Sequence, residues 1–284
     1  MAAWGSALPR LVGDVLADWK LARDGDPSFG ETALVLPVVT ESGAPAAAKF
    51  GWPHPEVEHA HVTLRTWAGD GAVRLLRADP RRSVLLLERL DPERDLHQVG
   101  VVEASLIVAG LYARLHRPPL PQLERLSRLA DRWSSDLPRL SATNLLPRRL
   151  VDQAAALARD FAADLGTDRA LIHTDLHYGN VLAGGHEPWL AIDPKPLAGD
   201  PAYEVGPLLW NRWPEAVASR NIRDALLERM YTVVDAAGLD EDRVRNWVTV
   251  RAVLNVWWSV VDSPSRLGPD EATQATTIAK AVQR

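Results

Sequence analysis

The stretch LIHTDLHYGNVLAGGHEPWLAID, residues 171–193, contains the most informative pattern in this chain. Val181–Ala183 and Trp189–Ile192 are short apolar runs, and Gly184 and Gly185 lie between them. Because glycine adopts positive φ without steric cost, this pattern predicts a β-hairpin. The polar residues before the first run predict a loop that leads into the hairpin.

Asn180 and Asp193 lie about equally far from the turn of the expected hairpin. Antiparallel pairing is expected to bring them side by side at its open end. Their amide and carboxylate oxygens are hard ligands that suit Mg²⁺, which takes few protein ligands and completes its shell with water and phosphate oxygens. Asp175 precedes Asn180 by five residues, on the loop. It is therefore expected close to the metal, where it can act as a base.

An Asp base, a metal-binding Asn five residues later and a metal-binding Asp after a hairpin are typical of kinase-type phosphoryl transfer. The segment His173–Asn180 (HTDLHYGN) resembles the catalytic loop of aminoglycoside phosphotransferases. The run 187–201 (EPWLAIDPKPLAGDP) resembles the branch of that family with streptomycin 6-kinases and hydroxyurea phosphotransferases. The resemblance implies that Asp175 is the catalytic residue, that Asn180 and Asp193 bind Mg²⁺, and that ATP is the phosphate donor.

A zinc site is the main alternative, because His173, Asp175 and His177 carry side chains that bind this metal. Alternate residues share a face only in an extended segment, however, and the Tyr-Gly-Asn that follows indicates a loop. The sequence has no further cluster of His or Cys to complete a tetrahedral shell. Spacing and hairpin together favour the kinase interpretation. The resemblance then implies that His173 supports the loop by hydrogen bonding.

The composition of this 284-residue chain is that of an ordinary globular protein, with 46% hydrophobic and 24% charged residues. Its net charge of −5 does not indicate a nucleic-acid partner and is compatible with a cationic substrate. The chain has no cysteine, which excludes disulfides and thiol catalysis. The sequence shows neither a long uncharged apolar run nor a signal-peptide core, so we expect a cytoplasmic protein without a membrane partner.

The N-terminal part predicts a small antiparallel sheet with one helix inserted, in the order of a kinase small lobe. Its expected elements are a helix over 8–19, strands over 33–39, 45–50, 72–76 and 83–87, and a helix over 56–67. Lys49 is one of only four lysines and lies near a strand end. Its compact ammonium suits the α- and β-phosphates of ATP. A helix glutamate is expected to pair with it; Glu56 is chosen over Glu58, although either acid could instead cap the helix.

Two further segments are assigned to the nucleotide. Ser28 and Phe29 are placed at the tip of a phosphate-covering loop, although the segment lacks a Gly-x-Gly-x-x-Gly pattern and a plain turn fits it equally well. In the connector after the sheet, the backbone carbonyl of Glu88 and the N–H of Leu90 are assigned to the adenine edge. Both assignments follow from the resemblance to kinases.

The rest of the chain predicts helices over 99–116, 123–133, 150–165, 222–237 and 242–261. Asp200 is expected to cap a helix that begins beside it, and Glu204 is expected to have a structural role. The chain has 11 tryptophans, most of which must pack in the core. Trp258 and Asp262 are assigned to the substrate cleft, where an aromatic face and a carboxylate could contact a cation.

These features predict an α+β protein with the two-lobed fold of protein kinases. Residues 1–90 are expected to form the nucleotide-binding lobe and residues 91–284 the helical catalytic and substrate-binding lobe, with a hinge at about 88–92. The expected reaction transfers the ATP γ-phosphate to a hydroxyl of a small molecule, by resemblance an aminocyclitol antibiotic such as streptomycin. Two alternatives stay open: a kinase of the same fold that acts on hydroxyurea or a metabolite sugar, and a non-catalytic binding module.

Overall fold

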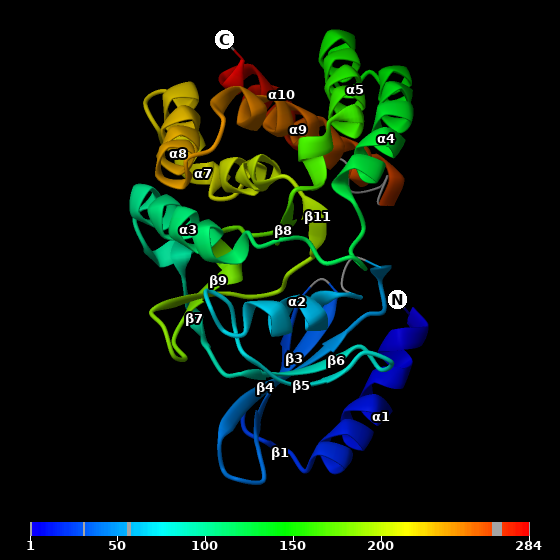
Figure 1. The fold of residues 1–284 in the computed structure, drawn as a ribbon, viewed down its shortest axis with the longest axis vertical. Coiled ribbons are helices and arrows are strands. Elements are labelled where there is room, and N and C mark those ends of the chain that lie inside the picture. Colours follow the sequence, from blue (N-terminus) through cyan, green and yellow to red (C-terminus); the bar gives the residue numbers. More distant parts are fainter. Residues whose placement is uncertain (1, 31, 56–57, 263–268, 284) are drawn as a thin grey trace. The chain divides into compact units, whose positions relative to one another are not determined.

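The computed structural model describes residues 2–30, 32–55, 58–262 and 269–283. The chain packs into two compact units, each made of two separate stretches of sequence. The first unit comprises Met1–Arg94 and Leu182–Lys195, and the second comprises Asp95–Val181 and Pro196–Arg284. Figure 1 labels the elements of both. None of the helices in these described ranges has the length and hydrophobicity needed to cross a lipid bilayer.

An antiparallel sheet forms the centre of the first unit. Its strands are β1 (Ala22–Arg23), β2 (Ser28–Phe29), β3 (Ala33–Val39), β4 (Pro45–Gly51), β5 (Leu75–Asp79) and β6 (Val84–Glu88). They lie in the order β1-β3-β4-β6-β5, and β2 also pairs with β3. In this register, Lys49 lies opposite Val35 on one side and opposite Leu85 on the other. Lys49 is therefore held on an inner strand of the sheet.

The two faces of this sheet have different environments because side chains alternate along each strand. The face with Phe50 is buried and packs against helix α1 (Ala2–Trp19), which runs beside the sheet in Figure 1. Val12 and Val15 of α1 are among the buried residues of this core. Lys49 lies on the opposite, half-buried face. That face is thus the one available to a ligand.

A second sheet, of three strands, contains the predicted hairpin. It consists of β7 (Asp91–Asp95), β9 (Val181–Ala183) and β10 (Trp189–Ala191) in the order β10-β9-β7. Gly184 and Gly185 in the turn have φ values of 108° and 66°. The prediction of a hairpin with glycines at positive φ is therefore confirmed.

The second unit is mostly helical. Its α-helices are α3 (Val101–Leu115), α4 (Leu126–Asp136), α5 (Arg148–Ala163), α6 (Gly206–Trp210), α7 (Trp213–Ala218), α8 (Ile222–Ala237), α9 (Glu241–Asp262) and α10 (Pro269–Val282). Helix α4 packs on α5, α3 on α8, and α9 on both α5 and α10. Two buried strands, β8 (Ala170–Ile172) and β11 (Leu197–Gly199), pair antiparallel among them. Single 3₁₀ turns at η5 (Tyr178–Asn180) and η6 (Pro201–Val205) follow these strands.

Several expected boundaries in the N-terminal part are wrong. The helix expected over 8–19 begins already at Ala2. The strand expected at 72–76 begins only at Leu75, because Ala72 pairs with Ala191 of the hairpin and the Val73 N–H donates to the Ala191 carbonyl oxygen. The helix expected to begin at Glu56 begins at Ala60. Prolines disfavour helical backbone in the residue before them, and Pro53 and Pro55 precede this helix.

The elements that were not expected from the sequence include β7, β11 and α10. Strand β7 has the sequence DPERD, which lacks the apolar alternation of a half-buried strand. It pairs because the hairpin strand β9 lies beside it. Tertiary pairing therefore decides its conformation in place of local preference.

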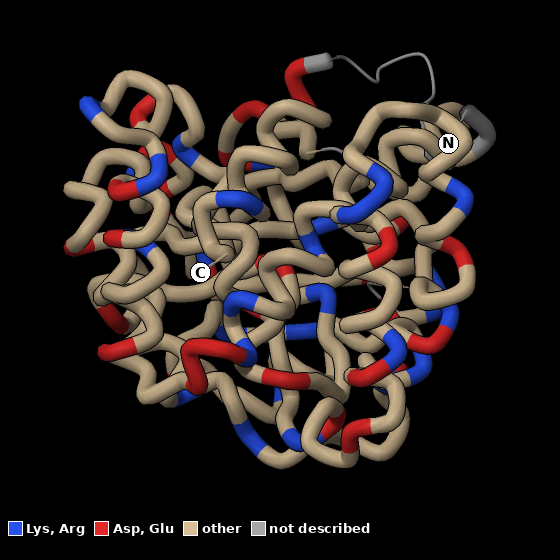
Figure 2. The backbone as a smooth tube through the Cα atoms, turned by 90° about the horizontal axis from the view of Figure 1, so that it is seen from above, with Lys and Arg blue, Asp and Glu red and all other residues tan. Residues whose placement is uncertain are grey.

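Basic and acidic residues are interspersed along the described backbone (Figure 2). Exposed pairs such as Lys20 with Glu41, 2.8 Å apart, contribute at most about 1 kcal/mol each. Among the buried charged side chains, Glu204 and Arg251 contact the predicted loop.

Candidate active site

The predicted catalytic loop connects β8 to β9 and is organised by its own hydrogen bonds. The Asn180 Nδ2 group donates to the Asp175 carbonyl oxygen at 2.8 Å and to Asp175 Oδ2 at 3.4 Å. The His177 N–H donates to the same carbonyl at 3.0 Å. The structure thus brings Asp175 and Asn180 together.

Thr174, directly before Asp175, has a strained backbone. Its φ is +66°, which is an outlier for a β-branched residue and costs about 1–3 kcal/mol. Its N–H donates to Glu204 Oε1 at 2.7 Å, and its carbonyl accepts from Arg251 Nη1 at 3.0 Å. Both partners are buried. Glu204 and Arg251 therefore hold the peptide that sets the direction of Asp175.

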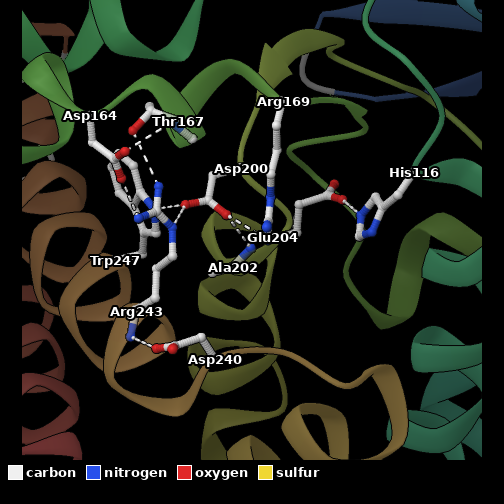
Figure 3. A network of polar contacts seen from close by, with 11 residues as sticks. His116, Asp164, Thr167, Arg169, Asp200, Ala202, Glu204, Asp240, Arg243 and Trp247 are labelled. Atoms are coloured by element: carbon white, nitrogen blue, oxygen red, sulfur yellow. Dashed lines mark hydrogen bonds and ion pairs between the residues drawn. The ribbon is translucent and has the colours of Figure 1, made fainter.

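Glu204 lies on η6 and is completely buried (Figure 3). Besides Thr174, its carboxylate accepts from the His173 N–H at 2.8 Å and contacts His116 Nε2. Burial by itself raises the pKa of this carboxyl. The hydrogen bond and charge of His116, the charge of His173 and the Thr174 N–H outweigh that effect, so the pKa of Glu204 lies below its ordinary value. The ionised form is thus favoured, and the structural role expected for Glu204 is confirmed.

Arg251 reaches the loop from helix α9. Its guanidinium lies 4.2 Å from the ring centroid of Tyr203 and 5.1 Å from that of Trp210. It also donates to the Tyr203 carbonyl at 3.3 Å. Two aromatic faces and two backbone carbonyls therefore fix the cation, which costs less to bury when it is paired in this way.

A second buried network anchors the segment after the hairpin (Figure 3). Asp200 caps η6 by accepting from the Ala202 N–H at 3.1 Å, which confirms the expected capping role. Its other oxygen accepts from Trp247 Nε1 at 2.7 Å and from Arg243. Arg243 also pairs with Asp164. Arg243 thus joins η6 to the end of α5.

The two histidines of the loop bind its backbone. His173 Nδ1 accepts from the Asp175 N–H at 3.3 Å, and His177 Nδ1 accepts from the Gly179 N–H at 3.1 Å. Over the described ranges, the structure gathers no group of three or more His, Cys, Asp or Glu side chains that could hold a metal ion. The arrangement favours the expected supporting role of His173 over a zinc site.

Lys49 and Asp193 lie together in the first unit. The Lys49 ammonium pairs with Asp193 Oδ1, and the two side chains are 16% and 35% exposed. Asp193 has a φ of +56°, a conformation that aspartate tolerates better than most residues. The Asp193 carboxylate therefore pairs with the positive charge of Lys49, and a metal ligand must likewise bind a positive charge.

The glutamate expected to pair with Lys49 was Glu56, which lies outside the described residues. Glu58 is exposed and lines the same pocket as Lys49, together with His61 and Ala60 of helix α2 (Ala60–Trp67). Burial lowers the pKa of His61. Position on the pocket wall therefore makes Glu58 available to that site, while its pairing with Lys49 stays a proposal.

The other assigned residues occupy varied surroundings. Ser28 and Phe29 form β2, and Phe29 is 75% exposed. Leu90 is buried. Trp258 lies edge-on to Trp133, with ring centroids 6.2 Å apart. Asp262 ends helix α9, and its side chain lies outside the described residues.

Sequence reasoning did not single out His116, Arg251 or His186. Arg251 carried a usable signal, because it is the only charged residue in the apolar run Val248–Leu254 of a predicted helix. A cation there must be buried with a partner or face solvent. His116 and His186 have no such signal, because their partners come from distant parts of the sequence.

Comparison with known proteins points in one direction. A family model described as aminoglycoside/hydroxyurea antibiotic resistance kinase matches residues 18–262. The streptomycin 6-kinase of Streptomyces glaucescens is 41% identical over 280 residues, which cover 97% of this chain and 91% of that protein. The hydroxyurea phosphotransferase of Kitasatospora aureofaciens is 41% identical over 279 residues, covering 95% and 78%.

Among solved structures, the choline kinase LicA from Streptococcus pneumoniae has a TM-score of 0.62 to this chain at 13% identity. The alignment covers 97% of this chain and 98% of that one. At this identity the likeness concerns the fold alone. The expected fold of the protein-kinase type, with an antiparallel sheet and a helical part, is thereby confirmed.

Proposed function

Because the chain belongs to the aminoglycoside/hydroxyurea antibiotic resistance kinase family, we propose that it phosphorylates a hydroxyl of an aminocyclitol antibiotic such as streptomycin. The chain is a phosphotransferase that acts on hydroxyl groups, as the streptomycin kinases among its relatives are. The observation that carries the choice of substrate is the 41% identity to a streptomycin 6-kinase over nearly the full length of both chains. The phosphorylated product would be a different compound from the antibiotic, and such modification is a route to resistance.

Asp175 is the proposed catalytic residue. Its carboxylate accepts the proton of the substrate hydroxyl and directs the oxygen toward the γ-phosphorus. The rigid peptide at Thr174 supports this role, because a positioned base is effective only when its direction is set before the substrate arrives. Asn180 is hydrogen-bonded to Asp175, which keeps this proposed metal ligand next to the proposed base.

Asn180 and Asp193 are proposed to hold Mg²⁺, and Lys49 to hold the nucleotide phosphates. Both ligands offer hard oxygens, and the pairing of Asp193 with the Lys49 ammonium is consistent with a cation at that carboxylate. When bound, Mg²⁺ would neutralise charge on the phosphate oxygens. Lys49 contributes a fixed positive charge from an inner strand, and its contact with Asp193 orients it.

The remaining nucleotide contacts are proposed from the sequence. Ser28 and Phe29 would cover the phosphates, and the backbone of Glu88 and Leu90 would bond the adenine edge. A hinge between the two functional lobes is proposed at about residues 88–92. The position of Ser28 and Phe29 in β2, and of Glu88 at the end of β6, supports the nucleotide contacts. ATP is most abundant in the cytoplasm, which is the proposed site of action.

Hydroxyurea is a second candidate substrate. The specific observation in its favour is the equal identity, 41%, of this chain to a hydroxyurea phosphotransferase. A cationic aminocyclitol offers more to recognise, because it can bind to an aromatic face and a carboxylate, for which Trp258 and Asp262 are proposed. Hydroxyurea lacks a permanent charge and therefore needs a different set of contacts.

The test is to incubate the purified protein with ATP and Mg²⁺ and either streptomycin or hydroxyurea, and to analyse both by mass spectrometry. We expect one phosphate to be added to streptomycin, and NMR of the product to locate it on one hydroxyl. Transfer to hydroxyurea alone would reject the aminocyclitol proposal. Absence of transfer to either compound, by a protein that binds ATP, would reject both substrates.

A matched pair of variants guards against contaminating kinases. Asp175→Asn removes the proposed base, whereas Asp131→Asn changes an aspartate that is exposed on helix α4. The expected product must disappear with the first variant and remain with the second.

A further inference from the structure

His186 lies in the turn of the β9–β10 hairpin and makes contacts through both nitrogens of its ring. Nδ1 lies 3.1 Å from Glu88 Oε2, and Nε2 lies 2.7 Å from the Gly69 carbonyl oxygen. The side chain is 18% exposed, and that of Glu88 is 15% exposed. All three residues belong to the first unit. These are therefore part-buried contacts within one unit.

Each contact of His186 ties the hairpin to a different element. Glu88 ends β6, and Gly69 follows α2 directly after its C-cap Ala68. Glu88 is fixed in turn, because Oε1 accepts from the Arg74 N–H at 2.6 Å and its own N–H donates to the Arg74 carbonyl at 3.0 Å. His186 is thus the point where the hairpin, helix α2 and the end of β6 meet.

The close approach is built into the backbone on both sides of the ring. A Cβ on Gly185, whose φ is +66°, would lie 2.8 Å from Glu88 Oε2. A Cβ on Gly69, whose φ is +89°, would lie 3.2 Å from His186 Nε2 and 2.9 Å from Arg74 Cγ. Only glycine meets both the conformational and the spatial demand at these positions.

Both partners of the ring are acceptors, and this determines the proton count. A carbonyl oxygen cannot donate a hydrogen bond, and a carboxylate cannot either. A neutral imidazole has one N–H, so it satisfies only one of the two partners. The contacts to Glu88 and Gly69 are complete only when His186 carries a proton on both nitrogens.

We propose that His186 is a positioning residue for the nucleotide, which holds together the three elements proposed to bind ATP. The hairpin leads to Asp193, α2 lines the pocket of Lys49, and Glu88 ends the strand that becomes the connector. Loss of either contact of the ring frees one of these elements from the other two. The affinity for ATP should therefore fall when the ring is replaced.

Other charged groups near the ring are few in the described part of the unit. Glu187, on the same turn, has Oε1 3.7 Å from His186 Nε2. Arg94 lines the same open surface as His186 and Glu187, and the Arg74 side chain lies against Gly69. Glu88 is the one acid with an oxygen in hydrogen-bond distance of the ring. The contact to test is therefore the His186–Glu88 pair.

This inference rests on the proposed function for the identity of the nucleotide, so ATP binding is measured directly by calorimetry, without any acceptor. His186→Gln should weaken ATP binding about tenfold, since one amide nitrogen cannot reach both Glu88 and Gly69 as the two ring nitrogens do. In turnover assays the KM for ATP should rise while kcat changes little. His54→Gln, another histidine of the same unit, is the matched control.

A second variant separates positioning from mere packing. Glu88→Gln keeps the size of the side chain but replaces the carboxylate that faces Nδ1. It should weaken ATP binding in the same direction as His186→Gln. The two changes together should weaken it by less than the sum of the single effects, because both act on one contact.

NMR of ¹⁵N-labelled histidine gives a readout without nucleotide. The resonances assigned to His186 by their absence in His186→Gln should shift in Glu88→Gln and stay in place in His54→Gln. Equal ATP affinities of the wild type and His186→Gln would overturn the proposal. ATP binding that behaves as expected, in a protein that phosphorylates neither candidate acceptor, would reject the proposed substrate and leave this inference intact.

Discussion

At the scale of single residues, the active loop is shaped by one unfavourable conformation and the groups that maintain it. Thr174 keeps a φ of +66° because its backbone N–H donates to Glu204 and its carbonyl oxygen accepts from Arg251. Strain of this kind persists only where the surroundings over-determine it. The consequence is that buried groups set the backbone direction at Asp175, the residue proposed as the base.

Asp175→Asn tests the base itself. The amide keeps the shape of the side chain but loses its charge and basicity, so turnover should fall by about 10²–10⁴-fold. ATP affinity should hardly change, because Asp175 is assigned neither to the phosphates nor to the metal. Steady-state kinetics and calorimetry on one preparation check both statements, and retained turnover would mean that the central motif has another role.

Glu204→Gln tests the buried carboxylate through the pH dependence of stability. The pKa of Glu204 lies below its ordinary value of 4.5, so its ionised form stabilises the fold above that pH. This contribution should be lost as the pH falls from 4.5 through the lowered pKa. The variant should therefore be less stable at neutral pH, by about 1–3 kcal/mol, and the gap should close in acid.

Urea unfolding at several pH values measures that gap. Glu228→Gln is the matched control, because Glu228 is exposed on α8. A gap between wild type and Glu204→Gln that is the same at pH 3 as at pH 7 would contradict the assignment of charge to Glu204.

At the scale of elements, strand β4 serves both stability and function through its alternation. One face carries Phe50 into the core beneath α1, and the other carries Lys49 toward Asp193. A shift of the register by one residue would exchange these faces. The seven paired positions between β3 and β4 fix this register, and they therefore fix the position of Lys49 as well as the packing of the core.

Leu36→Ala tests the core side of this sheet. Leu36 is 2% exposed, lies opposite Ala48 and belongs to the cluster beneath α1. Truncation of a buried leucine leaves a cavity and should destabilise the protein by about 2–5 kcal/mol. Thermal and urea unfolding provide the measurement. Leu76→Ala, at a half-exposed position of β5, should cost much less.

At the scale of the whole molecule, the residues proposed for catalysis and metal binding are distributed over the two compact units in the sequence. Asp175 and Asn180 belong to the second unit, whereas Lys49 and Asp193 belong to the first. The chain passes between the units after Arg94, after Val181 and after Lys195. Residues Leu182–Lys195, which contain the hairpin, pack with Met1–Arg94 in the first unit. The packing units are therefore not obtained by dividing the chain once at the connector.

Binding of Mg²⁺ and ATP tests the two proposed metal ligands. A ligand that binds only the folded state stabilises it by about 2.7 kcal/mol at a hundred times its Kd. Because Asn180 and Asp193 are assigned to the metal, ATP with Mg²⁺ should raise the melting temperature more than ATP with EDTA. Equal shifts in the two conditions would count against both ligands. Asp193→Asn should reduce the effect of Mg²⁺ and leave that of ATP alone largely unchanged.

The sequence by itself determined the hairpin, the central strands, most helices and the spacing of Asp175, Asn180 and Asp193. These features depend on local rules, such as apolar periodicity, glycine at positive φ and proline or capping residues. The tertiary structure alone decided the pairing of charged β7, the start of α2, and the partners of Glu204, Arg251 and His186. Burial of a polar group is stabilised by whichever partner the fold brings near it, and those partners lie between 30 and 117 residues away along the chain.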